Sequence, residues 1–203
     1  GVAGIGGLGH MAVQIGKAMG AKVIAFTTTK GKIEELKSLG ADQVVVMDDE
    51  DALSELEQSL DLMVNTIPYA YDPTPYLNLM KPNTTFVTVG NMIELEAFNP
   101  APLVFHRIAI SGSLIGGVAD TQEVLDLCAK HDIRPEIELI AMADIDKAFK
   151  RLKDEDVRFR HVIDMATLAS RTDELLLVET RDPDLVGPGP AAFSRSPGLR
   201  RRR

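Results

Sequence analysis

Apolar positions follow two different rhythms along the first part of the chain. The stretch 8–19 carries apolar side chains at helical spacing, and Gly20 after it suits a C-terminal cap. The short apolar run 22–26 that comes next is typical of a β-strand. With a further strand expected around Val2, this order predicts a strand, a helix and a second strand.

The same alternation continues to residue 113. We expect helices at 32–39, 51–60 and 75–80, and strands at 43–47, 61–66, 84–90 and 107–113. Strands that alternate with helices in this way build a parallel sheet with helices on both faces. The predicted fold class is therefore α/β, with a doubly wound parallel sheet of six strands.

More elements follow than a six-stranded sheet can use. We expect a helix at 120–131, a strand at 137–140, a helix at 144–152 and a strand at 158–165. Because these C-terminal elements lie beyond the predicted sheet, we expect them to pack against another domain.

The character of the sequence changes near Leu168. The remaining residues are rich in Pro, Gly and Arg, and only 175–178 forms an apolar run. Such a segment buries too little apolar surface to offset its chain entropy, so it is predicted to be a disordered tail. The predicted organisation is a sheet domain at 1–134, a C-terminal segment at 135–167 and a tail at 168–203.

Composition narrows the possible functions. The chain has 203 residues, a formal net charge of -8 and one cysteine, Cys128. A single cysteine excludes an intrachain disulfide and a zinc site built on paired cysteines, and it suits a reducing cytoplasm. The acidic balance argues against general affinity for nucleic acid, and no apolar run approaches the ~18 residues that a membrane helix needs.

A glycine motif stands between the first predicted strand and the first predicted helix. Gly4, Gly6 and Gly9 have G-x-G-x-x-G spacing. In a dinucleotide-binding loop, the first glycine permits a tight turn, the second lets a pyrophosphate approach the backbone, and the third lets helix and strand pack closely. The alternative is a flexible turn with no ligand, but strand, turn, helix and second strand all occur in the required order.

The end of the second predicted strand indicates which dinucleotide would bind. A carboxylate at this place would bind the ribose hydroxyls of NAD. The sequence has hydroxyl and ammonium groups instead, in Thr27, Thr28, Thr29 and Lys32. These groups suit the 2′-phosphate of NADP. The alternative is that Thr28 and Thr29 only cap the following helix.

Residue types that bind zinc do not cluster in the sequence. The four histidines, His10, His106, His131 and His161, are scattered, and none has a Glu or Cys at ligand spacing. Each is predicted to lie on a helix surface or at a strand end. The lone Cys128 is predicted to be a small buried hydrophobic residue. No catalytic or metal-binding residue is assigned.

Several motifs together resemble one family. They are Gly-Ile-Gly-Gly-Leu-Gly-His-Met-Ala-Val-Gln at 4–14, Gly-Ala-Asp at 40–42, Leu-Met-Lys-Pro at 79–82, Val-Gly at 89–90, Gly-Ser-Leu-Ile-Gly-Gly at 112–117, Thr-Gln-Glu at 121–123 and Val-Arg-Phe-Arg-His-Val-Ile-Asp at 157–164. In this order they closely resemble the cinnamyl-alcohol-dehydrogenase-like branch of the medium-chain, zinc-dependent alcohol dehydrogenases. The resemblance covers roughly residues 1–165.

The resemblance implies a Rossmann fold and a parent enzyme that interconverts aldehydes and primary alcohols. Such an enzyme transfers a hydride to or from NADP(H) and uses a catalytic zinc as a Lewis acid. In the family, the zinc ligands lie in a domain before the cofactor-binding domain, and this chain does not contain that domain. Its first strand is only residues 1–3, so we expect the sequence to begin within a strand.

The resemblance also assigns binding roles to residues. The pyrophosphate loop would be Gly4, Gly6, Gly7, Leu8 and Gly9. The 2′-phosphate contacts would be Thr27, Thr28, Thr29 and Lys32, and Thr66 would face the adenosine side. The nicotinamide would approach Val89, Gly90, Asn91, Ser113, Leu114 and Ile115, and Arg160 would reach back to the pyrophosphate. For Val89 and Ile115 the alternative is burial at a strand end, and for Arg160 a place on the surface.

In the family, the sixth strand pairs with the same strand of a second copy. The resemblance therefore implies a homodimer in which Ile108, Ala109 and Ile110 lie at the seam.

Three functions remain open from the sequence. The first is the cofactor-binding part of an NADP-dependent zinc alcohol dehydrogenase. The second is a truncated, catalytically silent module that still binds a dinucleotide, and the third is a zinc-free oxidoreductase related to quinone reductases. The sequence motifs at 112–117 and 157–164 favour the zinc-dependent branch over the zinc-free oxidoreductase.

We predict that the 203-residue chain alone does not oxidise alcohols at any zinc concentration. One cysteine and four scattered histidines do not supply three protein ligands with an open fourth position. The measurement is NADPH formation from benzylic and aliphatic alcohols by the purified chain. Turnover that survives removal of host dehydrogenases would contradict the prediction.

Overall fold

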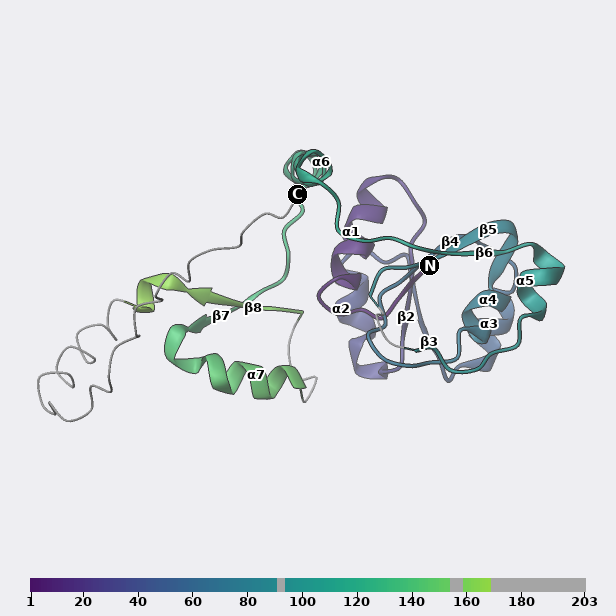
Figure 1. Cartoon of the computed structure of the whole chain (residues 1–203), viewed down its shortest axis with the longest axis horizontal. Coiled ribbons are helices and arrows are strands. Elements are labelled where there is room, and N and C mark those ends of the chain that lie inside the picture. The colour runs from purple at the N-terminus through teal and green to yellow at the C-terminus, as the bar shows by residue number, and fades with distance from the viewer. Residues whose placement is uncertain (91–93, 154–158, 169–203) are drawn as a thin grey trace, which may run out of the picture.

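A computed structural model describes residues 1–90, 94–153 and 159–168 of the chain (Figure 1). The described residues contain a six-stranded parallel sheet with the order β3-β2-β1-β4-β5-β6 and a two-stranded parallel sheet. The six strands are β1 (Val2–Ala3), β2 (Ile24–Thr27), β3 (Gln43–Val46), β4 (Leu60–Asn65), β5 (Met80–Thr88) and β6 (Ala109–Gly112). The predicted doubly wound α/β sheet is confirmed.

Helices cover both faces of this sheet. They are α1 (Gly9–Ala18), α2 (Ile33–Ser38), α3 (Glu50–Glu55), α4 (Thr74–Asn78) and α5 (Ala101–His106), with a 3-10 turn, η1 (Lys30–Lys32), before α2. Figure 1 shows α1 and α2 on one side of the strands and α3, α4 and α5 on the other.

Two hydrophobic clusters fill the spaces between the sheet and its two helix layers. Successive side chains of a strand point to opposite faces, so Ala25 packs with Val13 of α1 and Leu36 of α2, whereas Phe26 packs with Leu77 of α4. All five side chains are at most 1% exposed. Strands buried on both faces read as continuous apolar runs, which is why the sequence predicted them well.

Several boundaries and one helix differ from the sequence prediction. The helix expected at 51–60 ends at Glu55, because Gln58 has a positive φ of 50° and the Leu60 N–H already bonds to the Leu79 carbonyl at 2.9 Å. The helix expected to reach residue 80 ends at Asn78, and β5 begins at Met80 rather than at 84.

Helix α5 was not expected from the sequence. Pro100 and Pro102 flank its start and suggest a loop, but proline is tolerated in the first helical turn, where no N–H partner is needed. The helix is only six residues long, so it carries almost no periodic signal. Arg107, in the left-handed conformation with φ 53°, ends it.

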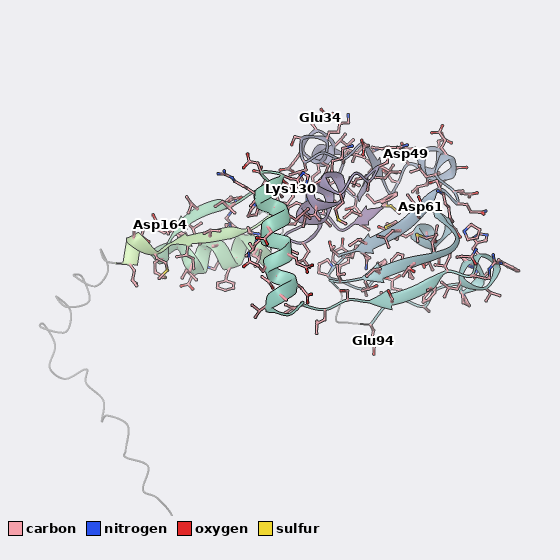
Figure 2. The ribbon with its side chains drawn as sticks, turned by 90° about the horizontal axis from the view of Figure 1, so that it is seen from above. Glu34, Asp49, Asp61, Glu94, Lys130 and Asp164 are labelled. Carbon is pink, nitrogen blue, oxygen red and sulfur yellow. The ribbon has the colours of Figure 1, made fainter. Side chains whose placement is uncertain are left out.

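The C-terminal elements form a separate small layer beside α1 and α2 in Figure 1. Strands β7 (Glu138–Ala141) and β8 (His161–Asp164) pair in parallel, with the 3-10 turn η2 (Met142–Asp144) and helix α7 (Ile145–Lys153) between them and the 3-10 turn η3 (Met165–Leu168) after β8. Helix α6 (Val118–Lys130) stands between the six-stranded sheet domain and the β7–β8 layer, with its axis across the long axis of the molecule (Figure 1; Figure 2).

Helix α6 begins two residues earlier than expected. The Asp120 carboxylate accepts a hydrogen bond from the Gly117 N–H at 2.8 Å and so caps the start of the helix. None of its residues is fully buried. In the described ranges, no helix has the length and apolar character needed to cross a lipid bilayer. The tail predicted from Leu168, including 175–178, lies outside the described residues apart from Leu168 itself.

We predict that the chain can be shortened to Leu168 without loss of stability, but not to Ala166. Thr167 Oγ1 accepts a hydrogen bond from the Met142 N–H at 2.8 Å and donates to the Asp164 carbonyl at 2.6 Å. Loss of a bond of this kind costs about 1 kcal/mol. For a chain of this size, Tm should fall by roughly 2–4 °C after truncation at Ala166.

Thermal unfolding of the full chain and of the two shortened chains measures this difference. A Tm several degrees lower for the chain that ends at Leu168 would show that residues 169–203 contribute to the fold.

Candidate functional site

The predicted glycine loop lies at the carboxyl end of β1, next to β4. In the order β3-β2-β1-β4-β5-β6, the strand order reverses between β1 and β4. Parallel α/β sheets bind their ligands at such a switch point. Gly4 has a φ of 80°, and a Cβ there would lie 2.6 Å from the Ile67 backbone nitrogen. A Cβ at Gly9 would lie 2.4 Å from the Gly4 carbonyl oxygen, so α1 can approach β1 only without a side chain.

The second glycine of the motif faces open space. No heavy atom lies within 4 Å of a Cβ placed on Gly6. Helix α1 begins directly after the loop, and its N-cap residue, Leu8, makes no side-chain hydrogen bond to the helix. A ten-residue helix therefore presents its positive end through a loop that leaves room for an anion.

Thr66 holds this loop from the end of β4. Its Oγ1 lies 3.2 Å from the Ala3 carbonyl oxygen and also contacts the Gly4 carbonyl oxygen. Gly90, after β5, packs so closely that a Cβ would lie 2.6 Å from the Thr66 carbonyl oxygen. Thr66 is 7% exposed, and its side chain supports the loop from below.

The residues predicted to bind the 2′-phosphate lie at and just after the carboxyl end of β2. Thr27 is buried, and its Oγ1 accepts a hydrogen bond from the Thr29 N–H at 3.1 Å. Thr28, Thr29 and Lys32 are not buried. Thr29 is the N-cap of η1 but makes no side-chain capping bond, so the alternative interpretation of Thr29 as a cap is not supported.

A cleft of about 550 Å³ adjoins these residues, and the sequence analysis missed it. It is lined by Lys30, Ile33, Val46 and the acidic residues 48–51. The Lys30 ammonium lies 3.4 Å from the Asp48 carboxylate, across the ends of β2 and β3. Residues 48–51 follow β3, which pairs with β2. Their position beside Lys30 also depends on the path of the loop after β3, which the sequence does not reveal.

The residues predicted to approach a nicotinamide follow β5 and β6. The Val89 N–H donates to the Asn65 carbonyl at 2.9 Å, and the Ser113 N–H donates to the Thr88 carbonyl at 3.1 Å. Leu114 is 82% exposed and Ile115 is 91% exposed, so Ile115 is not a buried strand end. Asn91 lies outside the described residues.

The C-terminal segment contacts the glycine loop from the other end of the chain. Arg160 Nη2 donates to the Gly7 carbonyl at 2.8 Å. The neighbouring Phe159 is 9% exposed and packs into the cluster that contains Val2 and Ile5. Residues more than 150 positions apart in the sequence therefore meet at the loop.

His10 corrects the prediction of a surface histidine. It is fully buried, stacks on Phe159 with ring centroids 4.6 Å apart, and its Nδ1 lies 3.1 Å from the Gly6 carbonyl oxygen. Burial, which disfavours the charged imidazolium, lowers the pKa of His10 below its usual value. Its place after Gly9 was visible in the sequence, but its partner Phe159 was not.

The residues that could bind a metal remain apart in the described ranges. There, no group of three or more His, Cys, Asp or Glu side chains is arranged to hold a metal ion. Cys128 is partly exposed on α6 rather than buried, which corrects its predicted environment. His161 is partly buried, 3.5 Å from the Glu138 carboxylate.

A glycine loop at the start of a helix, at the switch point of a six-stranded parallel sheet, defines a Rossmann dinucleotide-binding domain. Residues 7–130 match the family model of the zinc-binding dehydrogenases. The chain therefore belongs to the zinc-binding dehydrogenase family, as its motifs suggested.

Curated proteins that resemble the chain include alcohol dehydrogenases. The chain is 42% identical over 172 residues to NADP-dependent alcohol dehydrogenase C 1 of Mycolicibacterium smegmatis, a match that covers 83% of this chain and 48% of the relative. The chain spans about half the length of the curated relatives it matches.

Solved structures agree with the fold. A cinnamyl alcohol dehydrogenase of Sorghum bicolor superposes with a TM-score of 0.76 at 36% identity, covering 81% of this chain and 47% of that one. A cinnamyl alcohol dehydrogenase of Helicobacter pylori, solved in complex with NADP(H), has a TM-score of 0.69 at 36% identity, with the same coverage of the two chains.

We predict that Thr66→Val destabilises the chain and that Thr66→Ser does not. Valine keeps the shape of threonine but loses the hydroxyl bond to the glycine loop, which costs about 1 kcal/mol. The Tm of Thr66→Val should therefore fall by roughly 2–4 °C, whereas serine keeps the donor. Thermal unfolding followed by circular dichroism gives the values, and equal Tm values for threonine and valine would contradict this role.

Proposed function

We propose that the chain is the cofactor-binding part of an NADP-dependent alcohol dehydrogenase that interconverts aldehydes and primary alcohols. The observation that carries the proposal is the open glycine loop next to a strand end without a carboxylate. At the end of β2 the chain offers Thr28, Thr29 and Lys32, none of them buried. Names of the relatives support both the cofactor and the reaction class.

The residues present fit the dinucleotide. The space above Gly6 admits a pyrophosphate, and the uncapped start of α1 faces it. Arg160, whose guanidinium bonds to the Gly7 carbonyl at 2.8 Å, has further N–H groups that can bind a phosphate oxygen. When bound, NADP(H) accepts or supplies the hydride of the reaction.

The chain's own part in the reaction is to bind and orient. The backbone after β5 and β6, at Val89, Gly90 and 113–115, would hold the nicotinamide end, while the glycine loop holds the centre of the cofactor. No described residue is assigned to proton transfer. The described residues also do not fit a zinc ion, so no step through zinc is derived for them.

A second copy of the chain would extend the sheet. All four residues of β6 are exposed, and Ile110 is 40% exposed on this edge strand. An apolar edge with unpaired backbone groups is suited to pairing with another strand. We therefore include a homodimer through β6 in the proposal, with the antiparallel pairing that a two-fold axis requires.

We predict that the chain binds NADP⁺ at least about tenfold more tightly than NAD⁺, a difference of about 1.4 kcal/mol. The variant Thr28→Asp should reverse this preference, because its carboxylate repels a 2′-phosphate and accepts hydrogen bonds from ribose hydroxyls. Isothermal titration of the full chain with both cofactors measures the four dissociation constants.

Ser54→Asp is the matched control for this variant. It adds the same charge on an exposed position of α3, away from the end of β2. It should leave the preference unchanged. Tighter binding of NAD⁺ than of NADP⁺ by the unmodified chain would contradict the proposed cofactor.

A further inference from the structure

His10 is placed to control how the peptide groups of the glycine loop are oriented. Its side chain has no exposed surface, and the Nδ1 atom lies 3.1 Å from the Gly6 carbonyl oxygen. A carbonyl oxygen can only accept, so Nδ1 must carry the proton. The backbone N–H of His10 donates to the same carbonyl at 3.1 Å. The Gly6 carbonyl is thus held by two donors from one residue.

Holding a carbonyl also fixes the neighbouring N–H. In a planar trans peptide the C=O and N–H bonds point in opposite directions. With the Gly6 carbonyl turned toward His10, the Gly7 N–H points away from α1's first turn. In the same way, the bond from Arg160 to the Gly7 carbonyl at 2.8 Å turns the Leu8 N–H away from Arg160.

The ring of His10 is itself held by the C-terminal segment. Phe159 stacks on it with an interplanar angle of 13°. Phe159 is 9% exposed, and its backbone has a φ of 69°, a conformation that a bulky residue adopts only when its surroundings require it. A Cβ at Gly7 would lie 3.2 Å from the Phe159 carbonyl oxygen. The pair Phe159 and Arg160 therefore lies directly against the loop.

Packing alone does not account for an imidazole at this place. The His10 Nε2 atom is buried without a hydrogen-bond partner among the described residues. A buried polar atom left without a partner costs about 1–3 kcal/mol. An apolar ring would stack on Phe159 without that cost. What the imidazole adds is the Nδ1 donor to Gly6.

We infer that His10 is a positioning residue for the dinucleotide-binding loop, acting through its Nδ1 donor to the Gly6 carbonyl while Phe159 fixes its ring. Cofactor affinity then depends on contacts made by residues 159–160. The inference rests on the proposed function, because it names what orients the loop that would bind the pyrophosphate.

The charged groups near the ring favour its neutral form. Burial lowers the pKa of His10 most, the Arg160 guanidinium lowers it further, and the Glu136 carboxylate and the carbonyls of Gly6 and Gly7 act in the opposite direction. The lowered pKa favours the neutral ring, and the contact with the Gly6 carbonyl assigns its single proton to Nδ1. Long-range ¹H–¹⁵N spectra of the full chain report this tautomer directly.

Two variants separate the donor from the ring. His10→Phe keeps a stacking ring without a donor, and His10→Asn keeps an N–H donor at the position of Nδ1 without a ring. We expect His10→Phe to have an unchanged or higher Tm, yet to bind NADP⁺ about tenfold more weakly, as loss of one well-placed interaction of about 1.4 kcal/mol implies. His10→Asn should bind within about threefold of the unmodified chain.

The control is His131→Asn, an exposed residue at the end of α6, which should change neither value. An affinity of His10→Phe equal to that of the unmodified chain would overturn the inference, as would an Nε2-protonated ring. If the unmodified chain binds no NADP⁺, the proposed function fails instead. The inference is then judged on the amide order parameters of Gly7 and Leu8, which should fall in His10→Phe and not in His10→Asn.

Discussion

The whole binding edge depends on how closely three pieces of backbone approach one another. The turn at Gly4 lies against Ile67, the start of α1 lies against Gly4, and Gly90 lies against Thr66. A Cβ atom at Gly4, Gly9 or Gly90 would overlap backbone atoms. A side chain at Gly4, Gly9 or Gly90 would therefore force the ends of β1, β4 and β5 apart. The open space above Gly6 exists because its neighbours are packed in this way.

Strands β2 and β3 could be predicted because their side chains are fully or partly buried on both faces. Val44 to Val46 and Ile24 to Phe26 are apolar without interruption, and each run follows a helix that ends near a glycine, Gly40 and Gly20 respectively. Elements that carry less periodicity were harder to find. Helix α5 is hidden between prolines, and the start of β5 at Met80 is hidden because Pro82 suggests a break. Pro82 lies where the pairing of β4 and β5 is irregular, between Met80 opposite Leu60 and Thr85 opposite Leu62, and proline is tolerated in a strand at such a place.

The candidate site likewise has a part that local sequence predicts and a part that it does not. Gly4 to Gly9 and Thr27 to Lys32 are contiguous segments whose spacing carries their chemistry, so the sequence alone was enough to name them as candidates. The support of the loop by Thr66 and the stacking of Phe159 on His10 depend on tertiary contacts across 62 and 149 positions. Nothing local distinguishes a histidine that faces water from one that is covered by a distant segment. Only the folded chain reveals the second case.

The contact between Arg160 and Gly7 joins the C-terminal segment to the first turn of the sheet, 153 positions away. A ribosome makes a chain from its N-terminus, so Gly7 emerges well before Arg160. Closing so long a span also carries a large entropic cost that only a nearly complete fold repays. The glycine loop therefore gains its contact with Arg160 only after the C-terminal segment has been made and has folded against it.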